Sequence, residues 1–311
     1  MSGGATDPAR ADAIARVETV LTRNLPGHAI GPIDHLKTGD GSTVCFAEID
    51  KTPVVVKSFT GIGAAQTVQD LRAELDLLVP TMSDGPYQVN RVVHAFPSDG
   101  VVVLTRAPGA PLNEVLRNAD AAQRAGLLEM AGRWLARYQS TRRKPGVFGP
   151  GFWLERAKNL DAGALTPEDR VRRRALLARL REYVVDSRGH PITRAATHGD
   201  FVSMNLSYDG AVLCGVDIQG TCWQAAAKDV ARFLVWEAVR ATPRSRPRRF
   251  GIDRADLDAV LASGVLDPAS ARTVLPVFIG AELLDRFIDA YGHPRLRDAS
   301  RLAIDSYAAD L

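Results

Sequence analysis

Two short segments carry polar residues where a buried strand would ordinarily be apolar. The segment "THGDFVSMNL" places Asp200 and Asn205 five residues apart. The segment "VLCGVDIQG" places Asp217 directly after apolar residues, twelve positions beyond Asn205. Between them, "NLSYDGAVLCGVD" predicts a β-hairpin with Asp209-Gly210 at its turn. Such a hairpin would bring Asp217 back beside Asn205.

This arrangement would collect two carboxylates and one amide at the end of a small sheet. Two neighbouring carboxylates repel each other and are costly to remove from water, so a cation is expected between them. Carboxylate and amide oxygens are the ligands that Mg²⁺ prefers, and Mg²⁺ commonly arrives with the phosphates of a nucleotide. The spacing therefore predicts a site for Mg²⁺ and a nucleotide.

The surrounding pattern predicts an α+β fold with two lobes. After an expected helix at about 9–24, β-branched residues and turn residues predict an antiparallel meander, interrupted by one helix at 64–82 with a period of three to four residues. Beyond Arg106 the pattern becomes mostly helical. The helices expected there span about 121–141, 167–186, 226–240, 254–261 and 269–291. We expect an N-lobe at 1–105 and a C-lobe at 106–311.

Composition excludes several other classes of protein. The chain of 311 residues is 46% hydrophobic and 24% charged, which is enough for a full core. Cys45, Cys214 and Cys222 show neither disulfide nor zinc spacing. No apolar run approaches the roughly 20 residues of a membrane span, and the start lacks a signal-peptide pattern. A formal charge of +3 gives little support to nucleic-acid binding. We therefore expect a cytoplasmic protein that binds no nucleic acid and has no membrane span.

The order Asp, four residues, Asn, then an Asp after a strand resembles the catalytic and metal loops of the protein-kinase-like fold. The form "HGDFVSMN" followed by "VDIQG" is similar to the aminoglycoside phosphotransferase and choline kinase family, in which His-Gly-Asp replaces the His-Arg-Asp of protein kinases. The resemblance covers most of the chain. It implies a bilobal protein-kinase-like fold whose antiparallel N-lobe binds a nucleotide and whose helical C-lobe carries the catalytic loop, the metal loop and the acceptor site.

The resemblance extends to the nucleotide-binding residues. Lys57 in "VVVKSF" matches the phosphate-binding Lys, and Glu74 in "LRAELDLL" matches the helix Glu that would pair with it. Asp70 is the competing candidate for that pairing, but Glu74 shares a face with the apolar positions of its helix. The segment "TGDGSTVCFAEI" matches the phosphate-covering hairpin, and "VLTRAPGAPL" resembles the hinge whose backbone would bind adenine. The positions implied by these two segments are Gly39, Gly41, Ser42, Leu104 and Arg106.

The resemblance also implies a role for each residue of the two polar segments. Asp200 would accept or orient the proton of the acceptor hydroxyl, while Asn205 and Asp217 would hold Mg²⁺. His198 and Asp229, the latter in "KDVARFL", would support the catalytic loop, with His198 structural rather than proton-transferring. The implied donor is ATP, with GTP as the alternative. The implied acceptor is a hydroxyl group of a small sugar-like or amino-alcohol metabolite.

Other interpretations remain open from the sequence. Gln219 stands where the family commonly has an acid, and Asp40 interrupts the glycine hairpin, so a catalytically weak nucleotide-binding module is an alternative. A protein kinase is less favoured, because no long activation loop follows Asp217. The segment "RATPRSRPRR", residues 240–249, carries five arginines and no acid. It indicates either an anionic acceptor or a solvated loop.

Overall fold

The computed structural model describes residues 8–39, 41–218, 222–240 and 246–310, so Asp40 and Gln219 lie outside the described residues. The chain divides into two compact units, Met1–Pro108 with Cys214–Gly220, and Gly109–Leu213 with Thr221–Leu311. Sequence analysis places the metal loop in the C-lobe, whereas the structure groups it with the first unit. The reason is local bonding, because Gly215 O accepts the backbone N–H of Asn90 at 3.2 Å.

The first unit is built on an antiparallel five-stranded sheet in the order β1-β2-β3-β6-β5. Strands β1, β2 and β3 form the predicted antiparallel meander, and β6 pairs with β3 ahead of β5. The strands are β1 (Asp34–Gly39), β2 (Ser42–Ile49), β3 (Thr52–Phe59), β5 (Val92–Phe96) and β6 (Val101–Thr105). Two short strands, β4 (Tyr87–Val89) and β11 (Leu213–Gly215), pair outside this sheet.

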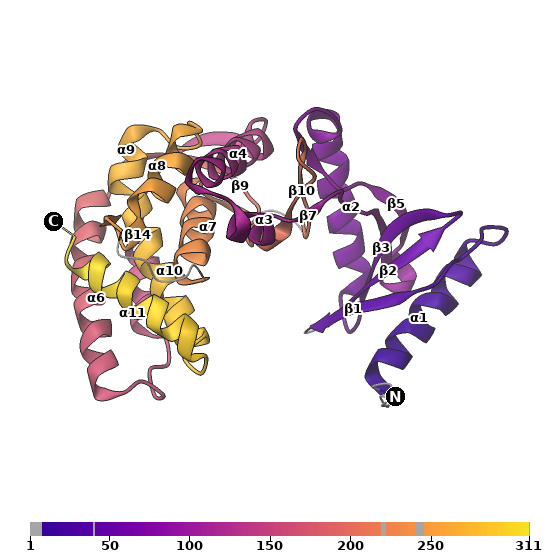
Figure 1. Ribbon diagram of the computed structural model, residues 1–311, viewed down its shortest axis with the longest axis horizontal. Coiled ribbons are helices and arrows are strands. Elements are labelled where there is room, and N and C mark those ends of the chain that lie inside the picture. The colour runs from indigo at the N-terminus through magenta and orange to yellow at the C-terminus, as the bar shows by residue number, and fades with distance from the viewer. Residues whose placement is uncertain (1–7, 40, 219–221, 241–245, 311) are drawn as a thin grey trace. The chain divides into compact units, whose positions relative to one another are not determined.

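Helices α1 (Pro8–Asn24) and α2 (Ala64–Met82) lie on opposite sides of this sheet (Figure 1). Helix α1 packs its apolar stripe, which includes Val17 and Leu21, against Val54 and Val56 of β3. Side chains alternate between the two faces of a strand. Lys57, which follows Val56, therefore lies on the face of the sheet opposite α1.

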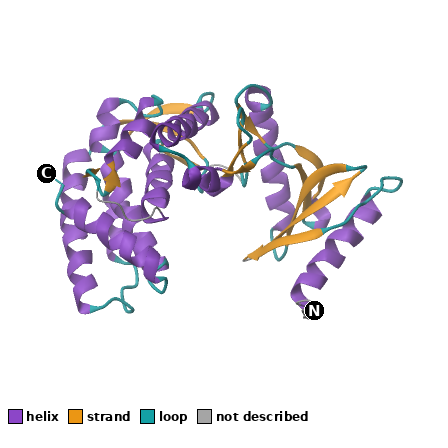
Figure 2. Cartoon of the chain, viewed as in Figure 1, coloured by secondary structure: helices purple, strands orange, loops and turns teal. Residues whose placement is uncertain are grey.

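The second unit is mostly helical (Figure 2). Its helices are α3 (Leu112–Asn118), α4 (Ala121–Gln139), α5 (Gly151–Lys158), α6 (Pro167–Ser187), α7 (Ala227–Arg240), α8 (Arg254–Ala262), α9 (Pro268–Thr273), α10 (Leu275–Asp289) and α11 (Pro294–Ala308). Its strands are β7 (Ala110–Pro111), β8 (Arg143–Val147), β9 (Pro191–Thr197), β10 (Leu206–Tyr208), β12 (Cys222–Ala225), β13 (Arg248–Arg249) and β14 (Ile252–Asp253). An antiparallel sheet in the order β12-β9-β8 leads the chain into the segment that carries Asp200.

The single helix expected at 269–291 is wrong, because the structure forms two helices there, α9 and α10, that meet at Val274. Pro276 lies in the first turn of α10, where its missing N–H costs nothing. In a continuous helix Pro276 would lack the N–H that bonds to the Arg272 carbonyl, and its ring would clash with that carbonyl, which explains the break. Helices α3, α5 and α11 were not predicted from the sequence.

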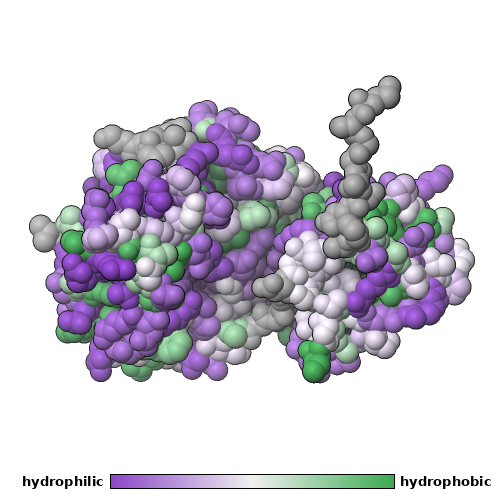
Figure 3. Space-filling view, turned by 90° about the horizontal axis from the view of Figure 1, so that it is seen from below, coloured by the Kyte–Doolittle hydropathy of each residue, from purple (hydrophilic) through white to green (hydrophobic). Residues whose placement is uncertain are grey.

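Polar residues cover most of the face drawn in Figure 3, with apolar residues scattered among them, as is usual for a protein surface. Within the described ranges, none of the helices has the length and apolar character that a membrane crossing requires.

Candidate active site

Lys57 and Asp217, which are 160 residues apart in sequence, meet in the first unit. Lys57 is buried on β3, and its Nζ lies 2.5 Å from Oδ1 of Asp217. Asp217 has a backbone φ of +63°, in the left-handed region that residues other than glycine rarely adopt. Such strain is found mostly where a functional geometry requires it. The predicted phosphate-binding Lys and the predicted metal-loop Asp are therefore brought into direct contact.

Glu74 is buried on α2, on the same stripe as Leu71 and Leu75. Asp70 is exposed and accepts a hydrogen bond from Gln66 Nε2 at 2.8 Å. A carboxylate buried among apolar side chains requires a polar partner, whereas an exposed one is hydrated. The burial favours Glu74 over Asp70 as the helix Glu, and its pairing with Lys57 stays a prediction.

The hairpin between β1 and β2 has the form expected of a tight phosphate-covering turn. Gly39 pairs with Ser42, which leaves a two-residue loop. Gly41 has φ +73°, a conformation that favours glycine, and its carbonyl accepts the Thr60 N–H at 2.9 Å. The contact of Gly39, Gly41 and Ser42 with phosphate stays a prediction.

The segment predicted as the hinge begins inside the sheet. Leu104 is buried in β6 and pairs with Val55 on one side and Val92 on the other. The Thr105 N–H donates to Arg91 O at 2.8 Å. Arg106 is the first residue beyond β6, and its guanidinium lies 4.4 Å above the Phe46 ring. The ladder around Leu104 favours Arg106 as the place of the predicted backbone contact with adenine.

In the second unit, Asp229 fixes the start of the catalytic loop. Its Oδ2 accepts the His198 backbone N–H at 2.7 Å and its Oδ1 accepts the Gly199 N–H at 3.1 Å. Asp229 is fully buried in the first turn of α7, and this burial raises the pKa of its carboxyl. The two backbone donors oppose that shift. Asp229 therefore supports the loop through the backbone.

The ring of His198 lies in an aromatic cluster beneath the loop. Its centroid is 6.0 Å from that of Trp134, 5.9 Å from that of Tyr138 and 6.0 Å from that of Phe201. His198 is only 5% exposed. This packing agrees with the structural role expected of His198.

The Asp200 carboxylate is held from two sides. Arg232 on α7 donates to Oδ1 from Nε at 2.8 Å and from Nη2 at 2.6 Å. Asn205 Nδ2 donates to Oδ2 at 3.1 Å and to the backbone carbonyl of Asp200 at 2.9 Å. Arg232 also contacts Glu282 on α10, with Nη1 3.0 Å from Oε1. The orientation of Asp200 is thus determined by Arg232 and Asn205.

A second set of contacts supports the loop at Ser203, in the 3₁₀ turn Ser203–Asn205. The Ser203 hydroxyl donates to Oε1 of Glu237 on α7 at 2.5 Å. Arg124 on α4 binds Glu237 at 3.3 Å and Asp256 at 2.6 Å. Burial raises the pKa of Glu237, while Ser203 and Arg124 oppose that shift. Beyond this turn the predicted hairpin forms, since the Asp209 N–H donates to Val212 O at 3.3 Å between β10 and β11.

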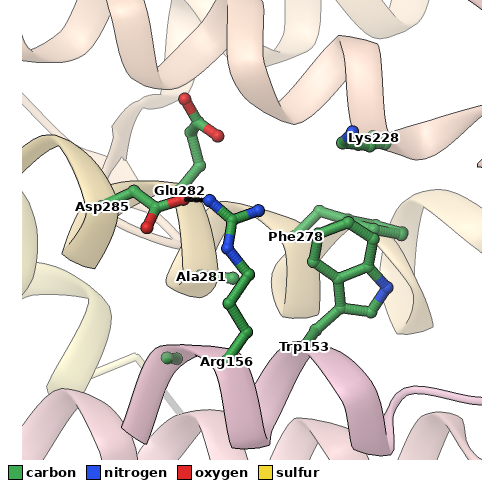
Figure 4. A pocket seen from close by; sticks show the side chains of 8 residues that line it. Trp153, Arg156, Lys228, Phe278, Ala281, Glu282 and Asp285 are labelled. Atoms are coloured by element: carbon green, nitrogen blue, oxygen red, sulfur yellow. Dashed lines mark hydrogen bonds and ion pairs between the residues drawn. The ribbon is translucent and has the colours of Figure 1, made fainter. Parts of the chain in front are cut away.

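A small hollow lies beside Glu282, between α5, α7 and α10 (Figure 4). Its apolar wall is the pair Trp153 and Phe278, whose rings are 5.0 Å apart. Arg156 reaches across it to Asp285 at 2.6 Å. The volume of the hollow is about 10 Å³, at the lower limit for holding a single water molecule. It is too small to hold an acceptor.

The donor set suits Mg²⁺ at Asn205. Because the Asn205 Nδ2 faces the Asp200 carbonyl, its Oδ1 is oriented away, and Oδ1 accepts no hydrogen bond from the described residues. An amide oxygen held in this way is a suitable ligand for Mg²⁺. No group of three or more His, Cys, Asp and Glu is placed to hold a metal within the described ranges. The joint binding of Mg²⁺ by Asn205 and Asp217 stays a prediction.

Sequence reasoning missed Arg232, Glu237 and Arg124. Arg232 is in "KDVARFL", three residues beyond Asp229, so helical spacing could have placed both on the loop side of α7. Glu237 follows on the same helix. Arg124 gives no such signal, because an Arg near the start of a helix is usually solvated.

Comparison with known proteins agrees with this geometry. The sequence model of the phosphotransferase enzyme family (APH) matches residues 36–302. No curated protein matches the chain by sequence. Among solved structures, a thermostable mutant of aminoglycoside phosphotransferase APH(4)-Ia, in a ternary complex with ADP and hygromycin B, is 14% identical with a TM-score of 0.61, over 94% of this chain and 98% of that one.

Two further solved structures share the fold. A putative fructosamine-3-kinase from Thermobifida fusca YX-ER1 is 19% identical with a TM-score of 0.56, over 93% of this chain and 98% of that one. A choline/ethanolamine kinase family protein from Mesorhizobium loti is 16% identical with a TM-score of 0.57, over 95% and 92%. These likenesses confirm the predicted protein-kinase-like fold.

Proposed function

The chain belongs to the phosphotransferase enzyme family, and we propose that it transfers the γ-phosphoryl group of ATP to a hydroxyl group of a small metabolite. The observation that supports this most directly is the 2.5 Å contact between Lys57 and Asp217. It joins the residue proposed to hold phosphate to the residue proposed to hold the metal.

Each residue has a role that its surroundings favour. Lys57, a buried cation at the end of the sheet, holds the inner phosphates of the nucleotide. The nucleotide base contacts the backbone near Arg106. Asp217 and the Oδ1 of Asn205 are the ligands offered to Mg²⁺, which when bound neutralises phosphate charge.

Asp200 acts on the acceptor. Its carboxylate orients the acceptor hydroxyl for in-line attack and accepts the hydroxyl proton as the phosphoryl group is transferred. Arg232 is a positioning residue, since it fixes the carboxylate rather than touching the acceptor. Asp229 is likewise a positioning residue, because it holds the backbone of the loop.

The test is to incubate the purified protein with ATP, Mg²⁺ and a panel of hydroxylated metabolites, and to detect phosphorylated products by mass spectrometry. GTP in place of ATP identifies the preferred donor. We expect Lys57→Ala to weaken nucleotide binding and nearly to abolish turnover. A Lys57→Ala variant that turns over as fast as the parent protein would remove Lys57 from the site.

A catalytically silent nucleotide-binding module gives a different result in the same assay. It binds Mg²⁺-ATP in calorimetry but neither hydrolyses it nor phosphorylates any acceptor. Slow hydrolysis of ATP in the absence of an acceptor, if it is lost in Lys57→Ala, supports an active phosphotransferase over a silent module.

A further inference from the structure

The second unit contains a pocket of about 500 Å³ that the proposed catalytic roles leave unused. It lies at the C-terminal half of α7, near the starts of α4, α8 and α11. Three acids line it, namely Glu237, Asp253 and Asp256. Six arginines line it, namely Arg117, Arg124, Arg240, Arg246, Arg248 and Arg295. Two parts of the arginine-rich segment 240–249 thus line one pocket, while 241–245 lies outside the described residues.

The acids of this pocket are already paired. Arg124 binds both Asp256 and Glu237, and Arg246 binds Asp253 at 3.4 Å. Three other lining arginines have no carboxylate within 4.0 Å in the part of the chain that the structure describes, namely Arg117, Arg240 and Arg248. Arginine stays protonated in proteins. The pocket therefore carries positive charge that its own acids do not neutralise.

Arg240 is one of these three arginines. It is partly buried, and its guanidinium lies 3.1 Å from the centroid of the Trp236 ring. Burial and the nearby charge of Arg286 lower the pKa of Arg240 to about 10. A bound anion would offset both effects.

Trp236 provides an independent observation. It lines the pocket and is only 9% exposed. Its indole Nε1 has no hydrogen-bond acceptor within the described residues. A buried N–H donor in a protein normally has a partner, so an unpaired one beside Arg240, which has no carboxylate partner within the described residues, indicates a missing acceptor atom.

The pocket is connected to the catalytic loop. Glu237 in its wall accepts the hydrogen bond from Ser203, three residues beyond Asp200. Arg240 follows Arg232, the partner of Asp200, by eight residues on α7. At the 1.5 Å rise of an α-helix this is about 12 Å along the helix axis. That separation is the length of a small extended metabolite.

We propose that this pocket binds the anionic group, phosphate or carboxylate, of the acceptor, so that the substrate is a negatively charged hydroxyl compound. The inference rests on the proposed phosphotransferase function. It assigns Arg240 and Arg248 to substrate recognition.

The first experiment measures binding of inorganic phosphate and of malonate by calorimetry, with no nucleotide present. We expect the parent protein to bind at least one of the two anions. The double variant Arg240→Gln/Arg248→Gln should bind it at least tenfold more weakly. Trp236→Phe, which removes the N–H and keeps the ring, should weaken it less. Arg133→Gln, which changes an exposed arginine paired with Glu129 on α4, should leave it unchanged.

Phosphate could also bind at Lys57, so Lys57→Ala is the second control. Anion binding that survives Lys57→Ala and is lost in the arginine double variant supports the pocket. Binding with the reverse pattern places the anion at the nucleotide site and overturns the inference. Failure of both anions to bind the parent protein overturns it as well. If only one of the two anions binds, it shows whether the pocket selects a phosphate or a carboxylate group.

The second experiment compares related acceptors with and without an anionic group, ribose 5-phosphate with ribose and gluconate with glucose. Where a pair is phosphorylated, we expect the anionic member to have the higher kcat/KM by at least tenfold. The double variant should remove this preference by raising the KM of the anionic member and leave the KM of ATP unchanged. Equal use of both members overturns the inference.

The two failures are distinguishable through ATP hydrolysis without an acceptor. If ATP hydrolysis depends on Lys57 but no anion binds, the proposed phosphotransferase function stands and the inference of an anionic acceptor is wrong. If anion binding depends on Arg240 and Arg248 but ATP does not bind, the proposed phosphotransferase function is wrong instead.

Discussion

Arg232 binds Asp200 through two nitrogen atoms, at 2.8 and 2.6 Å, and holds Glu282 with the third at 3.0 Å. Asn205 binds the other carboxylate oxygen of Asp200 at 3.1 Å. Both oxygens of the proposed catalytic carboxylate are therefore hydrogen-bonded to the protein. A carboxylate restrained in this way presents one direction to a hydroxyl group, and such positioning is a large part of phosphoryl-transfer catalysis.

The contact with Arg232 predicts a positioning effect on rate. We expect Arg232→Met to lower kcat by roughly 10- to 100-fold with little change in Mg²⁺-ATP affinity, because a misplaced catalytic group can cost a factor of about 100. Steady-state kinetics and calorimetry measure the two quantities. Arg286→Met is the matched control, because Arg286 also binds Glu282, at 2.9 Å, and lies on α10 with it. Equal losses in the two variants would assign the effect to Glu282 rather than to Asp200.

Asp229 predicts a combined effect on stability and rate. In Asp229→Asn one of the two backbone donors, His198 N–H or Gly199 N–H, loses its acceptor. We expect a loss of about 1–3 kcal/mol in the free energy of unfolding, the usual cost of a buried unsatisfied group, and a lower kcat. Denaturant titration and steady-state kinetics measure the two effects.

Asp209 is the control for Asp229. It also accepts two backbone N–H groups, from Ala211 and Val212, but in an exposed turn. Asp209→Asn should cost much less stability and leave kcat unchanged. A comparable loss in both variants would show that burial of Asp229 is unimportant.

The polar residues of the catalytic segment were predictable because local spacing reports them. Asp200 and Asn205 lie five residues apart in one loop, and Asn205 Nδ2 donates to Asp200 Oδ2 at 3.1 Å. The β-branched residues of "TPVVVKSF" predicted the strand that carries Lys57, and the structure confirms a strand there. Short-range periodicity and turn residues carried these inferences.

The ion-pair network was not predictable, because it joins segments that are distant in sequence. Arg232 contacts Asp200 and Glu282, which are 32 and 50 residues away. Helical spacing could place Arg232 on the same side of α7 as Asp229, but it does not identify Asp200 and Glu282 as the partners of Arg232. The break between α9 and α10 was missed for a different reason, since the apolar period continues across it and only Pro276 marks the new helix.

Asp169 predicts how stability depends on pH. It is fully buried in α6 and accepts hydrogen bonds from Arg301 at 2.7 and 2.9 Å and from Tyr291 at 2.5 Å. Hydrogen bonds from Arg301 hold the pKa of the Asp169 carboxyl well below its usual range, against the effect of burial. Because the folded-state pKa is lowered, this stabilisation is present above the unfolded pKa and is lost as pH falls toward the folded value.

We therefore expect Asp169→Asn to lower the free energy of unfolding by about 3 kcal/mol at pH 7, as for a buried pair that loses one partner. The difference from the parent protein should shrink as pH falls below about 4, the usual Asp pKa. Tryptophan fluorescence during urea titration measures it, since all four tryptophans lie in the second unit. Asp258→Asn, in an exposed pair with Arg254, should change stability by less than about 1 kcal/mol. A difference for Asp169→Asn that grows on acidification would contradict the linkage.

Asp200 and Asp217 should respond differently to the same substitution, because the proposal gives them different partners. Asp217 contacts Lys57 and is proposed to contact Mg²⁺, so Asp217→Asn should weaken metal-dependent nucleotide binding as well as catalysis. Asp200 faces the acceptor in the proposal. Asp200→Asn should keep Mg²⁺-ATP binding and lower the transfer rate by roughly 10²- to 10⁴-fold, the usual contribution of a positioned base. Calorimetry with ATP, with and without Mg²⁺, and single-turnover kinetics show the contrast. If Asp200→Asn lost metal-dependent binding while Asp217→Asn kept it, the two roles would be reversed, and normal turnover in both variants would exclude this segment as the catalytic loop.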